Sequence, residues 1–192
     1  MSEILHAPLR VVGVNGSLQT PSKTGALLDA VLAAIGDRVD ADVRRIDLAP
    51  IAPGFAGAVA RDELSYEVAE ALSAVEEADV LVVGTPVYRA SFTGLFKHFF
   101  DFVEQRALVD TPVLLTATGG SERHTLAIEH QLRPLFGFFQ ALTLPTGVYG
   151  SSGDFAEGRV ASPRLLERIE AAVERSLPFV AHRSRAAVPA RW

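Results

Sequence analysis

The 192-residue sequence predicts an α/β fold, a doubly wound five-stranded parallel sheet with helices on both faces. Apolar runs short enough to be strands alternate along the chain with segments whose apolar residues recur at helical spacing. Such an alternation requires a parallel sheet that is wrapped on both faces. The run 79–84 is apolar nearly throughout, which is typical of a strand buried on both sides.

Five apolar runs are predicted as strands because they are short and rich in β-branched residues. They cover residues 9–14, 42–48, 79–84, 112–117 and 143–149. The second is expected at an edge of the sheet, because Arg44 and Arg45 interrupt its apolar alternation. Five strand–helix units give the flavodoxin-like strand order 2-1-3-4-5, whose ligand site lies beyond the carboxyl ends of strands 1, 3 and 4.

Apolar residues at helical spacing predict one helix that starts near Thr24 and four more after it. These four cover residues 61–77, 91–104, 124–142 and 163–180. Pro134 interrupts the helix 124–142 and removes a backbone hydrogen bond, so we expect a kink or a π-helical bulge there. Glycine, proline and polar residues predict loops, which cover residues 49–54, 85–90, 118–121 and 151–161.

The composition predicts one domain, residues 1–181, followed by an Arg-, Ala- and Pro-rich tail, residues 182–192, that is expected to be disordered. A net charge of −5 argues against a nucleic-acid partner, and the lack of an 18-residue apolar run argues against a membrane span. The chain has no cysteine, and among its five histidines only His124 and His130 approach a metal-ligand spacing. These two are six residues apart and would fall on different faces of a helix, so no metal site is expected. This composition favours a cytoplasmic protein.

The loop after the first strand predicts an anion site. It carries the hydroxyls of Ser17, Ser22 and Thr24 and the charge of Lys23, just before the N-terminus of a helix. The glycine spacing of a P-loop and of a dinucleotide fingerprint are both absent, so a single terminal phosphate, as in FMN, fits better than a pyrophosphate. In the alternative, Ser22 or Thr24 is only a helix cap and Ser17 only a turn residue.

Two further loops should meet the first, because they follow strands 3 and 4. In one of them, Pro86, Val87 and Tyr88 can present an aromatic side chain and backbone amides to a planar ligand. The other, Thr118-Gly119-Gly120-Ser121, lacks bulk where a ring must approach the backbone. The alternatives are a tyrosine that covers the end of the sheet and an ordinary helix-entry turn. A hydrolase elbow G-x-S-x-G is absent.

At these motifs the sequence resembles the NAD(P)H-dependent FMN reductases of two-component sulfonate monooxygenase systems. The matching stretches are Gly16-Ser17, Pro21-Ser22-Lys23-Thr24, Thr85-Pro86-Val87-Tyr88, Gly94-Leu95-Phe96-Lys97 and Ala117-Thr118-Gly119-Gly120-Ser121 through Arg133-Pro134. Residues 120–124 and 130–136 are most similar to the methanesulfonate-linked branch. In the alkanesulfonate branch a tyrosine takes the position of His130, carried by an extra residue that makes a π-helical bulge.

The resemblance implies that FMN is the cofactor, with its phosphate held by Ser17, Ser22 and Thr24. Pro86, Val87 and Tyr88 would then line the ring, and residues 118–121 would meet its pyrimidine edge. NADH or NADPH would donate hydride, and reduced FMN would leave for an FMN-dependent monooxygenase. Because the cofactor carries the chemistry, no catalytic side chain is named.

Several alternatives stay open from the sequence. The same fold supports an FMN-bound quinone, azo or chromate reductase and a flavodoxin-like electron carrier. Arg89 and His124 either contact the nicotinamide nucleotide or face solvent. Clustered phenylalanines predict both core packing and a subunit interface, and family members are dimers or tetramers. The preference between NADH and NADPH, and whether FMN is a bound cofactor or a passing substrate, are not determined.

Overall fold

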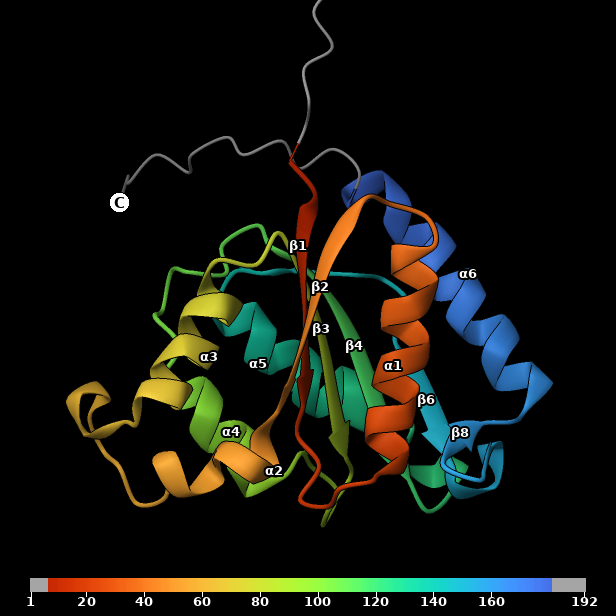
Figure 1. Cartoon of the computed structure of the whole chain (residues 1–192). Helices are drawn as coiled ribbons and strands as arrows, with labels where there is room; N and C mark the ends of the chain where they lie inside the picture. Colours follow the sequence, from red (N-terminus) through yellow and green to blue (C-terminus); the bar gives the residue numbers. More distant parts are fainter. Residues whose placement is uncertain (1–6, 181–192) are drawn as a thin grey trace, which may run out of the picture.

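A parallel sheet of order β2-β1-β3-β4-β5 runs through the molecule, and β6 also pairs with β4 (Figure 1). The computed structural model describes residues 7–180, so the predicted tail 182–192 lies outside the described residues. The strands of this sheet are β1 (Leu9–Asn15), β2 (Ala41–Asp47), β3 (Val80–Pro86), β4 (Pro112–Gly119), β5 (Leu142–Thr143) and β6 (Val148–Ser151). The predicted fold class and strand order are confirmed.

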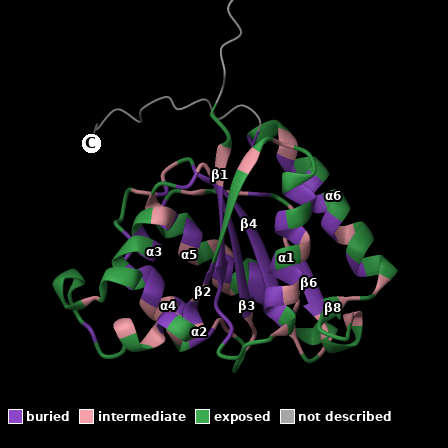
Figure 2. Ribbon diagram, viewed as in Figure 1, coloured by how far each residue is buried: buried purple, intermediate pink, exposed green. Residues whose placement is uncertain are grey.

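Helices cover both faces of the sheet. On one face lie α1 (Lys23–Gly36) and α6 (Pro163–Val180); on the other lie α2 (Leu48–Ile51), α3 (Tyr66–Glu76), α4 (Gly94–Asp101) and α5 (Arg133–Phe138). Each layer has its own buried apolar cluster, and β3 and β4 are buried along nearly their whole length (Figure 2). None of the helices within residues 7–180 has both the length and the apolarity to cross a bilayer.

Three predictions for the first half of the chain are wrong at element boundaries. The predicted loop 49–54 forms the short helix α2 and a 3-10 turn, because Pro50 and Pro53 fall in first turns, where a missing N–H costs nothing. The predicted helix 61–77 begins only at Tyr66, where the Ser65 hydroxyl accepts the Val68 N–H. The predicted helix 91–104 is shorter, because Thr93 caps α4.

The second half of the chain differs more from the predicted elements. The predicted helix 124–142 is a 3-10 turn, a π-helix over Ile128–Leu132 and then α5, so the bulge expected near Pro134 is present. The predicted strand 143–149 is split into β5 and β6, because Pro145 lies between them and has no N–H for a ladder. The predicted loop 151–161 contains a hairpin of β7 (Phe155–Ala156) and β8 (Arg159–Val160).

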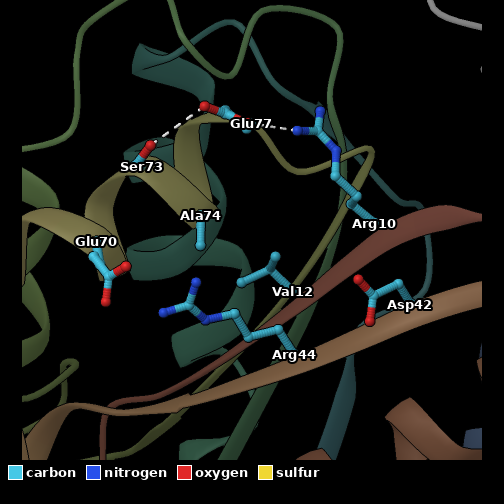
Figure 3. Close-up of a pocket in the computed structure, with 8 residues that line it drawn as sticks. All are labelled: Arg10, Val12, Asp42, Arg44, Glu70, Ser73, Ala74 and Glu77. Atoms are coloured by element: carbon cyan, nitrogen blue, oxygen red, sulfur yellow. Dashed lines mark hydrogen bonds and ion pairs between the residues drawn. The ribbon is translucent and has the colours of Figure 1, made fainter. Parts of the chain in front are cut away.

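A charged groove of about 270 Å³ lies beside the edge strand β2, between this strand and α3 (Figure 3). Arg10 is ion-paired there with Glu77 at 2.7 Å. Arg44 also lines the groove, and within residues 7–180 it makes no ion pair or side-chain hydrogen bond. The groove flanks the sheet and not the carboxyl ends of its strands, so it is separate from the three predicted loops.

Candidate flavin site

The three predicted loops meet at the carboxyl end of the sheet, which is the lower end in Figure 1. The Gly16 N–H donates to the Gly84 carbonyl at 2.7 Å, which ties the loop after β1 to β3. The Val87 N–H donates to the Thr118 carbonyl at 2.7 Å, which ties the loop after β3 to β4. The convergence expected from the strand order is therefore observed.

A buried pair of hydroxyls joins the first loop to the third. The Thr24 and Thr118 Oγ1 atoms lie 2.6 Å apart, and both residues are buried. Thr24 therefore uses its hydroxyl within the protein, and it locks the first turn of α1 against the end of β4. Thr93 adds a second link, because its hydroxyl donates to the Gly16 carbonyl at 2.9 Å and also accepts the Phe96 N–H. Thr93 was not singled out from the sequence, because its Gly16 partner is 77 residues away.

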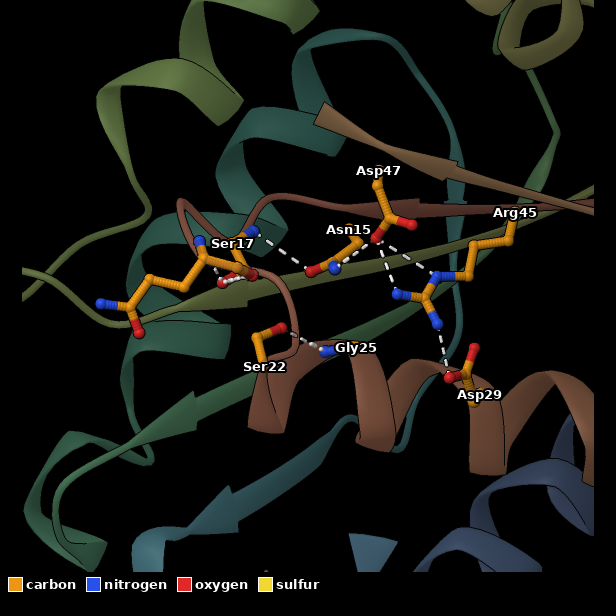
Figure 4. Close-up of polar contacts among 8 residues, drawn as sticks. Asn15, Ser17, Ser22, Gly25, Asp29, Arg45 and Asp47 are labelled. Atoms are coloured by element: carbon orange, nitrogen blue, oxygen red, sulfur yellow. Dashed lines mark hydrogen bonds and ion pairs between the residues drawn. The ribbon is translucent and has the colours of Figure 1, made fainter. Parts of the chain in front are cut away.

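The first loop ends in a helix N-terminus that is suited to an anion. The Ser22 hydroxyl accepts the Gly25 N–H at 2.9 Å and keeps its own hydrogen free to donate (Figure 4). The first helical N–H groups, of Lys23 and Thr24, have no acceptor within the helix, and no acidic residue lies in the first turn. The Ser17 hydroxyl donates to the Gln19 carbonyl and accepts the Gln19 N–H, both at 3.1 Å.

An amide–carboxylate–guanidinium chain holds this loop in place (Figure 4). Asn15 accepts the Ser17 N–H at 3.1 Å and donates to Asp47 at 2.6 Å. Asp47 also accepts from Arg45 at 2.7 Å, and Arg45 is ion-paired with Asp29 on α1. Burial lowers the pKa of Arg45, but its hydrogen bonds to the two carboxylates raise it above its ordinary value overall. The sequence did not predict this role for Asp47, Arg45 and Asp29, although β2 was expected to lie beside β1 and to end next to the first site loop.

The loop after β3 makes a two-residue turn at the rim of a cavity. Tyr88 and Ser91 exchange both backbone hydrogen bonds, at 2.8 and 3.1 Å, and the two residues between them have positive φ. The cavity has a volume of about 520 Å³ and is lined by Val87, Tyr88, Arg89, Ala90 and His124. Two predicted ring-lining residues, Val87 and Tyr88, therefore face this space, and Tyr88 is 44% exposed.

Tyr149 packs against the glycine loop after β4, residues 118–121, and fixes its position. The buried phenol donates to the Ser121 carbonyl at 2.7 Å, and a Cβ at Gly119 would lie only 2.3 Å from its oxygen. Burial raises the pKa of Tyr149, and the nearby charges of Glu122 and Asp154 raise it further, so the donor stays protonated at neutral pH. A Cβ at Gly120 would meet nothing within 4 Å, so this residue borders open space.

Comparison with known proteins agrees with this arrangement. A family model described as NADPH-dependent FMN reductase matches residues 9–156. The NADH-dependent FMN reductase SfnE of Pseudomonas putida is 52% identical over 179 residues, which cover 93% of this chain and 96% of the relative. An FMN reductase (NADPH) of Pseudomonas aeruginosa is 48% identical over 180 residues, which cover 94% of this chain and 97% of the relative.

A solved structure agrees as well. An oxidoreductase from Corynebacterium diphtheriae is 34% identical and superposes with a TM-score of 0.80, covering 93% of this chain and all of the other. The family match spans most of the chain and includes all three site loops. The chain therefore belongs to the NADPH-dependent FMN reductase family.

Proposed function

We propose that the protein, an FMN reductase that uses a nicotinamide nucleotide, carries out this reaction at the three converging loops and releases reduced FMN to a sulfonate monooxygenase. The observation that carries the proposal is the joining of a helix N-terminus, an aromatic turn and a glycine loop by direct hydrogen bonds. FMN, when bound, supplies the chemistry by accepting a hydride from the nicotinamide and passing on two electrons. The protein's part is to bind and orient the two molecules.

The described residues fit FMN. The N–H groups of Lys23 and Thr24 and the free hydroxyl hydrogen of Ser22 suit a phosphate, and Lys23 adds a positive charge. Val87 and Tyr88, with Pro86 before them, would line the ring on one side. Gly119, Gly120 and Ser121 would approach its polar edge, with Thr118 fixed beneath them by its bond to Thr24.

The delivery of reduced FMN to a sulfonate monooxygenase rests on two supports. The stretch 120–136 resembles reductases of such systems, and Tyr88 at the rim of the cavity is 44% exposed, as an open site that exchanges its flavin would require. We also propose a single domain of residues 1–181 in a cytoplasmic protein that forms a dimer or tetramer. Leu126 and Phe138, each 61% exposed beside the π-helix, would lie at the subunit interface.

The deciding experiment is the oxidation of NADH and NADPH by purified protein, with and without added FMN. Oxidation that saturates with added FMN supports the proposal and also ranks the two nucleotides. A protein that purifies yellow and does not respond to added FMN is a tightly bound flavoprotein. That result would favour a quinone or azo reductase, or an electron carrier, over the proposed release of reduced FMN.

Ser22→Ala tests the phosphate site. Loss of this cap should lower the free energy of unfolding by about 0.5–2 kcal/mol. Loss of its phosphate hydrogen bond should raise the KM for FMN about tenfold. Riboflavin has no phosphate, so its KM should stay unchanged. The matched control is Ser65→Ala, which removes the equivalent cap of α3 away from the site. The control should lose stability but keep its KM for FMN, and equal KM changes for FMN and riboflavin would contradict the assignment.

A further inference from the structure

We propose that Arg89 binds the pyrophosphate of the nicotinamide nucleotide at the rim of the 520 Å³ cavity. This inference rests on the proposed function and adds the residue that recognises the hydride donor. It is carried by three independent observations: the charge balance of the cavity, the backbone geometry of the turn, and the way the turn is anchored.

The charge balance favours an anionic ligand. Of the five described residues that line the cavity, Arg89 is the one with a permanent charge, and none is a carboxylate. Within residues 7–180, Arg89 makes no ion pair and no side-chain hydrogen bond. By contrast, Arg45 and Arg133 each have a carboxylate partner. A guanidinium without a partner can donate two parallel hydrogen bonds to phosphate oxygens, and it suits this task better than an ammonium group does.

The turn that carries Arg89 is kept in an unfavourable backbone conformation. Arg89 and Ala90 have φ values of 51° and 67°, as in the type I′ turns that favour asparagine and glycine. Residues with a Cβ at such angles cost about 1–2 kcal/mol each. Backbone strain of this kind concentrates at ligand-binding positions. In this turn the strained position next to Tyr88 is occupied by an arginine, although an Asn-Gly turn would adopt the same backbone conformation without this strain.

The turn is also fixed from outside. The Ser91 hydroxyl donates to the Gln131 side chain at 3.0 Å, so the π-helix anchors one end of the turn. At the other end, the Val87 N–H is bonded to β4. Arg89 therefore extends from a turn whose two ends are hydrogen-bonded to neighbouring elements, which lowers the backbone entropy lost when it binds.

The position of Arg89 favours contact with the pyrophosphate rather than with the 2′-phosphate of NADPH. The nicotinamide must lie against the flavin ring, which we place at Tyr88 and Gly120. One ribose joins the nicotinamide to the pyrophosphate, whereas the 2′-phosphate of NADPH lies on the distant adenosine ribose. A side chain next to Tyr88 reaches the nearer group. NADH and NADPH share this group, so Arg89 should serve both nucleotides equally.

The test is Arg89→Gln, assayed with added FMN and three hydride donors. The KM for NADH and for NADPH should each rise about tenfold, with kcat and the KM for FMN unchanged. The KM for 1-benzyl-1,4-dihydronicotinamide, which has no phosphate, should not change. Arg89→Lys should give intermediate values. In calorimetric titration of FMN-saturated protein, the Kd for ADP-ribose should rise by a similar factor.

Arg44→Gln is the matched control, because it removes another unpaired arginine, in the groove beside β2 (Figure 3). It should leave all of these constants unchanged. Unchanged constants in Arg89→Gln, or equal losses with the phosphate-free donor, would overturn the proposal. A KM change confined to NADPH would place Arg89 at the 2′-phosphate and overturn the pyrophosphate assignment. Failure of the proposed function is distinguishable, because the unsubstituted protein would then not oxidise either nucleotide with added FMN.

Discussion

Replacing Phe96 by alanine is expected to lower the free energy of unfolding by about 3–5 kcal/mol, the largest loss of stability predicted for this protein. Phe96 is fully buried in α4 and packs against the rings of Phe100 and Phe136, with centroids at 4.7 and 6.5 Å. The alanine would leave a cavity that this rigid cluster cannot close. Urea unfolding measured by circular dichroism would give the value.

The same substitution should also weaken flavin binding. Gly16 lies so close to Phe96 that a Cβ on the glycine would be 2.5 Å from the ring, so Phe96 supports the first site loop. The control is Phe138→Ala, which makes the same change at a side chain that is 61% exposed. It should cost the monomer little stability, while its sedimentation would report on the proposed subunit interface. Equal losses in the two variants would contradict this account of the core.

Gly119→Ala is expected to raise the KM for FMN by more than tenfold and to lower the free energy of unfolding by about 1–3 kcal/mol. The new methyl group would lie 2.3 Å from the Tyr149 phenol oxygen, which is buried and hydrogen-bonded to the Ser121 carbonyl. Either Tyr149 or the glycine loop must move, and both movements break this bond. Thermal unfolding and FMN-dependent NADH oxidation would measure the two effects.

Gly120→Ala separates the effect on flavin binding from the effect on stability. A Cβ at Gly120 meets no atom within 4 Å, so stability should be unchanged. If a flavin ring approaches this residue, as we propose, the KM for FMN should still rise. A Gly120→Ala protein with unchanged stability and unchanged flavin kinetics would remove the glycine loop from the flavin site. A stable Gly119→Ala protein would mean that Tyr149 can repack.

The sequence predicted the parts of the fold that depend on local pattern. Strands β1, β3 and β4 are apolar runs, and α6 has a long amphipathic face, so their positions follow from periodicity alone. The starts of α3 and α4 did not follow, because a single capping residue overrides an apolar pattern that continues upstream. The split between β5 and β6 was also missed, since a strand pattern was read through Pro145.

In the candidate site too, some features followed from the sequence pattern and others did not. The positions of the three loops followed from the strand order, because parallel strands bring their carboxyl ends to one edge. What each side chain does inside the loops did not follow. Asn15 depends on Asp47, 32 residues away, and Thr24 depends on Thr118, 94 residues away. Such partners are set by tertiary packing, so the sequence could not show that Thr24 anchors α1 to β4.

The two outer strands bear on how this protein resists aggregation. An exposed sheet edge is a template for pairing with another chain, and short, charged or irregular edge strands reduce that risk. At one edge, β2 is lined by Asp42, Arg44 and Arg45, whose charges would have to be desolvated in any strand-to-strand contact. At the other edge, the break between β5 and β6 leaves no long continuous strand with which another chain could pair. We therefore expect the charged β2 and the interrupted β5–β6 edge to limit edge-to-edge pairing between copies of this protein.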